Sequence, residues 1–170
     1  MLNNYLFGVN ETVREYVRLT QELDARDTPV VLVLFGDHKP WMGNGGSVYE
    51  EMGIDFDTST LAGFRNYYAT PYLIWANRAS KEVLGEDFTG DGGDFSPCFL
   101  MTRLFDACGW AGPGYMQLSR AMRDISPLLH TNGLFLHDGV LTSVLSDTDR
   151  SFYRSWLAVQ YYREHVAAYS

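Results

Sequence analysis

The sequence predicts an α/β fold with a mainly parallel central sheet flanked by helices. The segment 30–35 is apolar at every position, and such runs are typical of central strands that are covered on both faces. The run is far too short to cross a bilayer. Segments with the periodicity of amphipathic helices precede and follow it, and they are expected to flank the sheet.

The composition is that of one folded domain, or of one piece of a domain. The 170 residues are 46% apolar and 20% charged, and neither a repeat nor a linker divides them. The net charge of −8 argues against proteins that bind nucleic acids or anionic membrane surfaces, because both need clustered Lys and Arg. The sequence shows neither a signal peptide nor a transmembrane run, so the chain itself is expected to be soluble.

The first helix is expected over residues 10–26, with Asn10 as its N-cap. An apolar stripe along this helix predicts that it packs against the sheet. The helix then leads into the strand, and Pro29 stands where a missing backbone donor is tolerated. The stripe consists of Val13, Tyr16, Val17 and Leu23.

The strand ends in a turn that carries two adjacent candidate metal ligands. Gly36 allows the chain to bend, so Asp37 and His38 follow the carboxyl end of the strand, where open α/β sheets place their ligand sites. One carboxylate oxygen and one imidazole nitrogen suit Mn²⁺ or Zn²⁺. The alternative is a simple turn in which Asp37 caps backbone groups and His38 is exposed. The position at a strand end favours the metal site.

Polar segments surround the second expected strand, which covers 67–77. Residues 42–60 are glycine-rich, and a loop of this length is either a lid or binding loop, or a variable surface excursion. Residues 85–94 match four positions of a calcium loop, but the twelfth position is Cys98 instead of the bidentate Glu. A solvated turn is therefore favoured over a calcium site.

The C-terminal half is expected to be mostly helical. Ser96, with its hydroxyl as a cap, and Pro97 open a helix that ends at Gly109. Cys98 and Cys108 lie about 15 Å apart along this helix, too far for a disulfide, so both are expected to be packed thiols. Further helices are expected over 114–125 and 148–168, and a strand or hairpin arm over 133–136.

Two motifs follow each other along the chain. The first is FGDH at 35–38 with Pro40 behind it, and the second is YATPYLIWAN at 68–77. With the helix at 10–26 and the helix start FSP at 95–97, they resemble the C-terminal part of lipoteichoic-acid-synthase-like phosphoglycerol transferases, in the sulfatase branch of the alkaline phosphatase superfamily. The resemblance implies that residues 1–170 form a single domain, a partial sulfatase-like sandwich that is the C-terminal portion of a larger catalytic domain.

The resemblance also implies a metal-dependent enzyme. Asp37 and His38 would bind the catalytic ion, usually Mn²⁺ in this family, with Mg²⁺, Zn²⁺ and Ca²⁺ as alternatives. The family's nucleophilic Thr or Ser and its first metal-binding carboxylate lie upstream of this motif. Residues 1–170 are therefore expected to be inactive by themselves. The implied reaction transfers phosphoglycerol to lipoteichoic acid or a related cell-envelope polymer through a covalent phospho-enzyme.

Further side chains are weaker candidates. Lys39 either faces a substrate phosphate or is a solvated lysine. Trp41 either forms the floor of a glycerol or sugar site or is a partly buried core residue, and the core is favoured. His130 and His137 are poor candidates for metal ligation because no comparable strand leads into them, and His165 is expected at the surface.

The resemblance implies partners as well as a reaction. The substrate would be a phosphoglycerol lipid or another anionic ester, the upstream half of the catalytic domain would be a partner, and the full-length protein would be membrane-anchored with an extracytoplasmic catalytic domain. The alternatives to a phosphoglycerol transferase are a sulfatase or phosphodiesterase of the same superfamily and a non-catalytic α/β binding domain. Without its neighbours, an apolar strand edge near Val31 and Val33 is expected to cause self-association or low stability.

Overall fold

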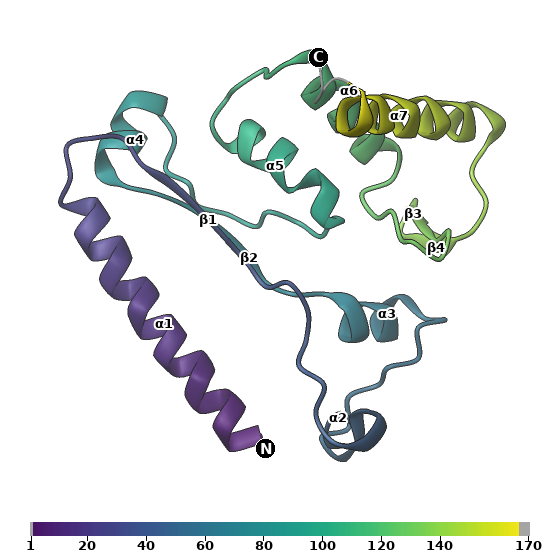
Figure 1. Cartoon of the computed structure of the whole chain (residues 1–170), viewed down its shortest axis with the longest axis horizontal. Helices are drawn as coiled ribbons and strands as arrows, with labels where there is room; N and C mark the ends of the chain where they lie inside the picture. The colour runs from purple at the N-terminus through teal and green to yellow at the C-terminus, as the bar shows by residue number, and fades with distance from the viewer. Residues whose placement is uncertain (1, 167–170) are drawn as a thin grey trace. The chain divides into compact units, whose positions relative to one another are not determined.

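The computed structural model describes residues 2–166, which form a mixed α/β structure with two small antiparallel sheets (Figure 1). Contacts within the chain divide it into two compact units, Met1–Thr89 and Gly90–Ser170, and each is described by itself. That both units belong to one larger catalytic domain stays a prediction.

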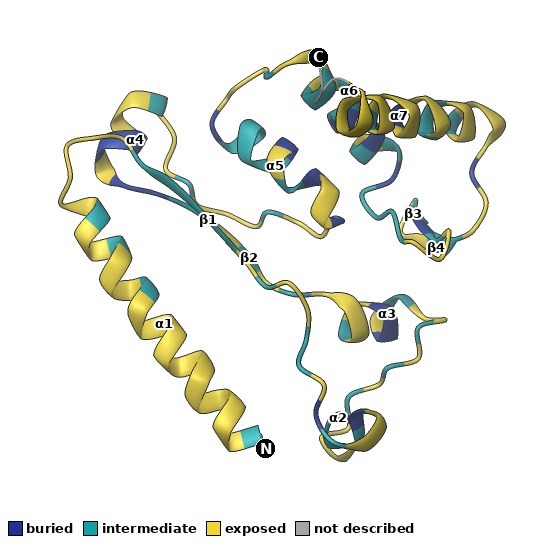
Figure 2. Cartoon of the chain, in the orientation of Figure 1, coloured by how far each residue is buried: buried dark blue, intermediate teal, exposed yellow. Residues whose placement is uncertain are grey.

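Helix α1 covers Leu2–Asp24 and is longer at its N-terminal end than the expected 10–26. Asn10 therefore lies inside the helix and does not cap it, because apolar residues at helical spacing continue upstream of it. The expected packing of the apolar stripe is wrong. None of the described residues of α1 is buried, and Val13 and Val17 are each 51% exposed. Figure 2 shows the helix exposed along most of its length.

The first sheet pairs β1, Val31–Phe35, with β2, Tyr72–Ala76. The pairing is antiparallel, with Val31 opposite Ala76, so the expected parallel arrangement is not seen among the described strands. The chain after β1 folds beyond the end of that strand and returns, instead of crossing over the sheet. A short apolar run predicts a strand but not the direction of its partner, which explains the difference.

The segment 42–60 is folded and has a small aromatic core of its own. Tyr49 is buried and contacts Phe56 with ring centroids 4.8 Å apart, and its hydroxyl donates to Pro40 O at 2.7 Å. Because the helix after this segment extends to Tyr68, β2 begins later than the expected 67. The elements here are the 3₁₀ helix η1, Asn44–Gly46, and the helices α2, Ser47–Glu51, and α3, Leu61–Tyr68.

Asn77 joins the end of the first sheet to two helices. Its side chain is fully buried, and its Oδ1 accepts from Val30 N at 2.9 Å and from Ser80 N at 3.0 Å. It therefore caps helix α4, Arg78–Leu84, which the sequence pattern does not predict. Its Nδ2 donates at 2.9–3.3 Å to three carbonyl oxygens at or after the end of α1, those of Leu23, Arg26 and Thr28.

The second unit packs its helices around a compact apolar core. Phe99, Met122 and Trp156 form this core and are each 3% exposed or less. The indole Nε1 of Trp156 also donates to Ser119 Oγ at 3.0 Å, which satisfies the buried N–H. The predicted helices are confirmed, although the last one ends at His165, before the expected 168, and residues 167–168 lie outside the described part. The elements are η2, Pro97–Phe99, α5, Leu100–Ala107, α6, Gly114–Ile125, and α7, Asp147–His165.

The hairpin arm expected over 133–136 is present as β3, Phe135–His137, which pairs antiparallel with β4, Val140–Thr142. Its turn consists of Asp138 and Gly139, with φ of 49° and 77°. An Asp-Gly pair with both φ values positive is the preferred sequence of a type I′ hairpin turn.

Two expectations about side chains of the second unit are wrong. The Ser96 hydroxyl does not cap η2, because it accepts from Leu129 N at 2.8 Å and donates to Leu129 O at 3.0 Å. It therefore ties the start of this helix to the segment before the hairpin. Cys98 is exposed, whereas Cys108 is buried as expected, and both thiols are free.

Candidate metal site

The turn that follows β1 is held by the segment that precedes β2. Gly36 N donates to Pro71 O at 2.9 Å, and the Thr70 hydroxyl donates to Gly36 O at 2.7 Å. A Cβ at Gly36 would lie 3.0 Å from the Cβ of Thr70, so this close approach favours glycine. The two sequence motifs therefore hold each other in place at this end of the sheet.

Asp37 and His38 lie side by side beyond this turn. The Oδ2 of Asp37 is 3.4 Å from the Nε2 of His38, and their side chains are 80% and 78% exposed. The Oδ1 of Asp37 also accepts from the His38 backbone N–H at 2.8 Å. Two metal–ligand bonds of about 2.1 Å to atoms this far apart would enclose an angle near the tetrahedral value. One ion can therefore be shared by the two side chains.

The other imidazole nitrogen of His38 faces a carbonyl. Its Nδ1 lies 3.0 Å from Lys39 O. Because a carbonyl oxygen only accepts, a hydrogen bond here places the proton on Nδ1 and leaves the lone pair on Nε2, the nitrogen next to Asp37. Carbonyl partners of this kind orient metal-ligating histidines. This lone pair and the Oδ2 of Asp37 are the two atoms that an ion at the pair would bind.

Within residues 2–166 the site consists of this pair alone. No group of three or more His, Cys, Asp or Glu side chains that could hold an ion lies in this part of the chain. A divalent ion with four to six ligands would take the others from water, substrate or another polypeptide segment. In the acidic loop 85–94, Asp91 accepts from Gly93 N at 2.8 Å, as in an ordinary polar turn.

Lys39 binds the carbonyl end of α3. Its ammonium donates to Asn66 O and lies 3.5 Å from Arg65 O, both in the last turn of that helix, and burial lowers its pKa. It is therefore not simply solvated, and contact with a substrate phosphate would require it to leave these carbonyls. Trp41 is 67% exposed, so the expectation of a core residue is wrong and the indole is accessible to a ligand.

The other histidines belong to the second unit. His137 Nδ1 lies 3.2 Å from Ile125 O, and its Nε2 is 3.7 Å from Asp138 Oδ2. His130 Nδ1 accepts from a backbone N–H two residues further on, at 3.3 Å. His165 is exposed, as expected. His137 with Asp138 thus forms a second Asp-His pair, but a wider one, which serves as a control for the first.

Sequence reasoning missed two residues that position the site. Thr70 holds the Gly36 carbonyl, and its only signal is its place in the second motif, just before Pro71. Tyr49 holds Pro40 through its hydroxyl, and no local pattern in the glycine-rich segment predicts this contact.

Comparison of the chain with protein-family models, with curated proteins and with solved structures found no match. Among the residues that the structure describes, no helix is both long enough and apolar enough to cross a membrane.

Proposed function

We propose that this chain is the metal-binding C-terminal part of an extracytoplasmic phosphoglycerol transferase that resembles lipoteichoic acid synthases. The observation that carries the proposal is the pair Asp37 and His38, which lies beyond a turn built jointly by the two motifs. The full protein would be membrane-anchored, and its catalytic domain would be a sulfatase-like sandwich with a mainly parallel central sheet.

The ion proposed for this pair is Mn²⁺, with Mg²⁺, Zn²⁺ and Ca²⁺ as alternatives. A carboxylate oxygen with an imidazole nitrogen is a mixed donor set, which Mn²⁺ and Zn²⁺ accept more readily than Mg²⁺ or Ca²⁺. Such an ion, when bound, supplies Lewis acidity at a phosphoryl oxygen and lowers the pKa of a hydroxyl nucleophile.

The residues of this chain would bind the ion and orient the substrate. Asp37 provides the negative charge of the pair, and the Lys39 carbonyl keeps the Nε2 lone pair of His38 available. Trp41 offers an exposed aromatic face to the glycerol or sugar part of a substrate. The Thr or Ser that forms the covalent phospho-enzyme is expected upstream, so the chain alone should turn over nothing.

The proposed partners are a phosphoglycerol lipid or another anionic ester as substrate, and the N-terminal half of the catalytic domain. Support for the second partner comes from α1, whose apolar residues are exposed where a larger core would cover them. Without that half, the chain is expected to self-associate through this surface more than through Val31 and Val33, which are partly covered. The most exposed apolar residues of α1 are Leu6, Phe7, Val13 and Val17.

A sulfatase or phosphodiesterase of the same superfamily would use the same pair of ligands, and a non-catalytic α/β binding domain would use neither. The coding sequence upstream of residue 1 separates these classes. A sulfatase-like half with a Thr or Ser nucleophile supports the enzyme, and its absence from the gene supports the binding domain.

A titration of the chain with Mn²⁺, followed by the electron paramagnetic resonance signal of the free ion, tests the proposal. We expect one weak site per chain, because two protein ligands bind a divalent ion poorly. Asp37→Ala and His38→Ala should each weaken Mn²⁺ binding at least about tenfold, because even the loss of an outer-shell partner of a metal ligand costs about 10–100-fold in affinity. His137→Ala, which alters the wider pair, is the matched control and should bind as the unmodified chain does. Equal affinities of His38→Ala and His137→Ala would contradict the assignment.

A further inference from the structure

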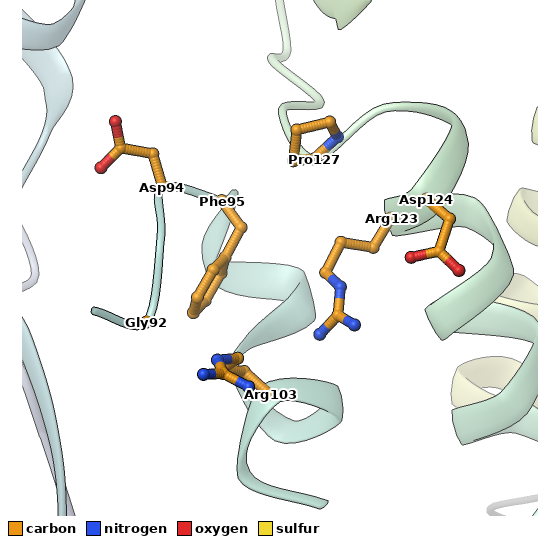
Figure 3. A pocket seen from close by; sticks show the side chains of 7 residues that line it. All are labelled: Gly92, Asp94, Phe95, Arg103, Arg123, Asp124 and Pro127. Carbon is orange, nitrogen blue, oxygen red and sulfur yellow. The ribbon is translucent and has the colours of Figure 1, made fainter. Parts of the chain in front are cut away.

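The second unit contains a cavity of about 330 Å³ that the proposed metal chemistry does not use. It lies between the segment before η2 and the helices α5 and α6. Figure 3 shows the guanidinium of Arg103 beside the ring of Phe95, and that of Arg123 reaching toward the same space. Its volume is at the lower end of the range of small-molecule sites.

Arg123 is held in position before any ligand arrives. Its side chain is 17% exposed, and its Nη2 donates to Asp106 Oδ2 at 2.6 Å. Its Nη1 donates to the hydroxyl of the buried Thr102 at 3.3 Å. A guanidinium has five N–H donors in a planar fork, so these two bonds fix its plane and leave further donors that can reach a ligand.

Arg103 is half-buried, and within residues 2–166 the structure shows neither a hydrogen bond nor an ion pair to its guanidinium. A guanidinium that has lost part of its hydration without gaining an anionic partner is unfavourable. An anion bound between Arg103 and Arg123 would remove this cost. This unpartnered cation is a second, independent sign of a ligand at the cavity.

The carboxylates near the cavity leave room for an anion. Asp94 and Asp124 line its edge and are exposed, and in Figure 3 the Asp94 carboxylate points away from both guanidinium groups while that of Asp124 lies on the far side of Arg123. Asp106 is bound by Arg123 and also by Arg120, whose Nε lies 2.5 Å from Asp106 Oδ1. The inner carboxylate of Asp106 is therefore compensated by two guanidinium groups, and the guanidinium of Arg103 stands apart from this cluster.

We propose that this cavity binds the phosphate group of a small hydroxylated compound, such as a sugar phosphate. Arg103 and Arg123 would hold the phosphate, since two guanidinium forks match its oxygens. The ring of Phe95 would pack against the C–H face of the carbon skeleton.

Calorimetric titrations of the full chain in EDTA test this proposal with inorganic phosphate, glucose 6-phosphate and glucose as probes. We expect glucose 6-phosphate to bind more tightly than inorganic phosphate, and glucose alone to give no heat of binding. Arg103→Gln should weaken the binding of inorganic phosphate and of glucose 6-phosphate at least about tenfold, as expected for the loss of charge-assisted hydrogen bonds. Because Arg103 holds no other part of the described chain, the variant should keep its melting temperature.

The matched control is Arg154→Gln, which removes the same charge from an exposed position on α7 away from the cavity. It should leave both affinities unchanged. Equal weakening by the two variants, no weakening by Arg103→Gln, or no binding of either phosphate compound would each overturn the proposal. Since EDTA removes divalent ions, the phosphate titration is independent of metal binding at Asp37 and His38. A negative phosphate titration would therefore not contradict the metal proposal, and a negative Mn²⁺ titration would not contradict the phosphate proposal.

Discussion

Replacing Asn77 with Ala should destabilise the first unit more than any other single change at a polar side chain there. The side chain is fully buried; its Oδ1 accepts two hydrogen bonds, and the two N–H groups of its Nδ2 are shared among three carbonyl oxygens. Each ordinary bond contributes about 1 kcal/mol net, and each buried group left without a partner costs about 1–3 kcal/mol. Water can reach some of the freed groups, so we expect a loss of about 3–5 kcal/mol.

Urea unfolding followed by circular dichroism measures the total loss, and hydrogen exchange locates it. The backbone N–H groups of Val30 and Ser80 should lose their protection in Asn77→Ala, because both donate to the side chain that is removed. Asn66→Ala is the matched control, since the side chain of Asn66 donates one exposed hydrogen bond, to Asp55 O. A loss below about 1 kcal/mol in Asn77→Ala, or unchanged exchange at Val30 and Ser80, would refute this role of Asn77.

Two further changes test the turn and the second unit. Gly36→Ala should lower the free energy of urea unfolding by about 1–2 kcal/mol, because the new Cβ would lie 3.0 Å from Thr70 Cβ. Gly8→Ala is the control: its new Cβ meets nothing within 4 Å inside α1, so it should raise the free energy of unfolding by about 0.5–1 kcal/mol. Changes of the same sign in the two variants would contradict the close approach at Gly36. Burial disfavours the charged form of Asp106, but the hydrogen bonds from Arg123 and Arg120 outweigh it and lower its pKa below the ordinary 3.8. The stabilisation from the Asp106 carboxylate should therefore be complete above pH 3.8 and be lost as the pH falls through the lowered pKa. The difference in melting temperature between the unmodified chain and Asp106→Asn should be large at pH 7 and shrink below pH 4. A difference that grows on acidification would contradict a lowered pKa.

The helices of the second unit could be predicted because their apolar residues recur at helical spacing between clear stop signals. The bounds of α6 match the prediction, and its apolar face carries the fully buried Met122. By contrast, α4 has only seven residues and its Val83 is largely exposed, so it has no amphipathic stripe from which a helix could be predicted. Its signals are the Asn77 cap and Gly85, whose φ of 70° ends the helix.

The direction of β2 could not be predicted, because it depends on how the segment after Gly36 folds. At the site, the closeness of Asp37 and His38 follows from their adjacency and from the turn, so the sequence was sufficient. The contact of Lys39 with Asn66 spans 27 residues and has no local signal. The same holds for the cavity, whose guanidinium groups come from different helices and meet only through the packing of α5 and α6.

The central claim is that Asp37 and His38 share one divalent ion. Pulsed electron paramagnetic resonance of the chain with substoichiometric Mn²⁺ tests it directly, because an imidazole nitrogen bound to the ion produces a resolved nitrogen coupling. The account predicts that this coupling is present in the unmodified chain and in His137→Ala, and that it vanishes in His38→Ala. A bound Mn²⁺ without nitrogen coupling, or a coupling that survives in His38→Ala, would contradict it.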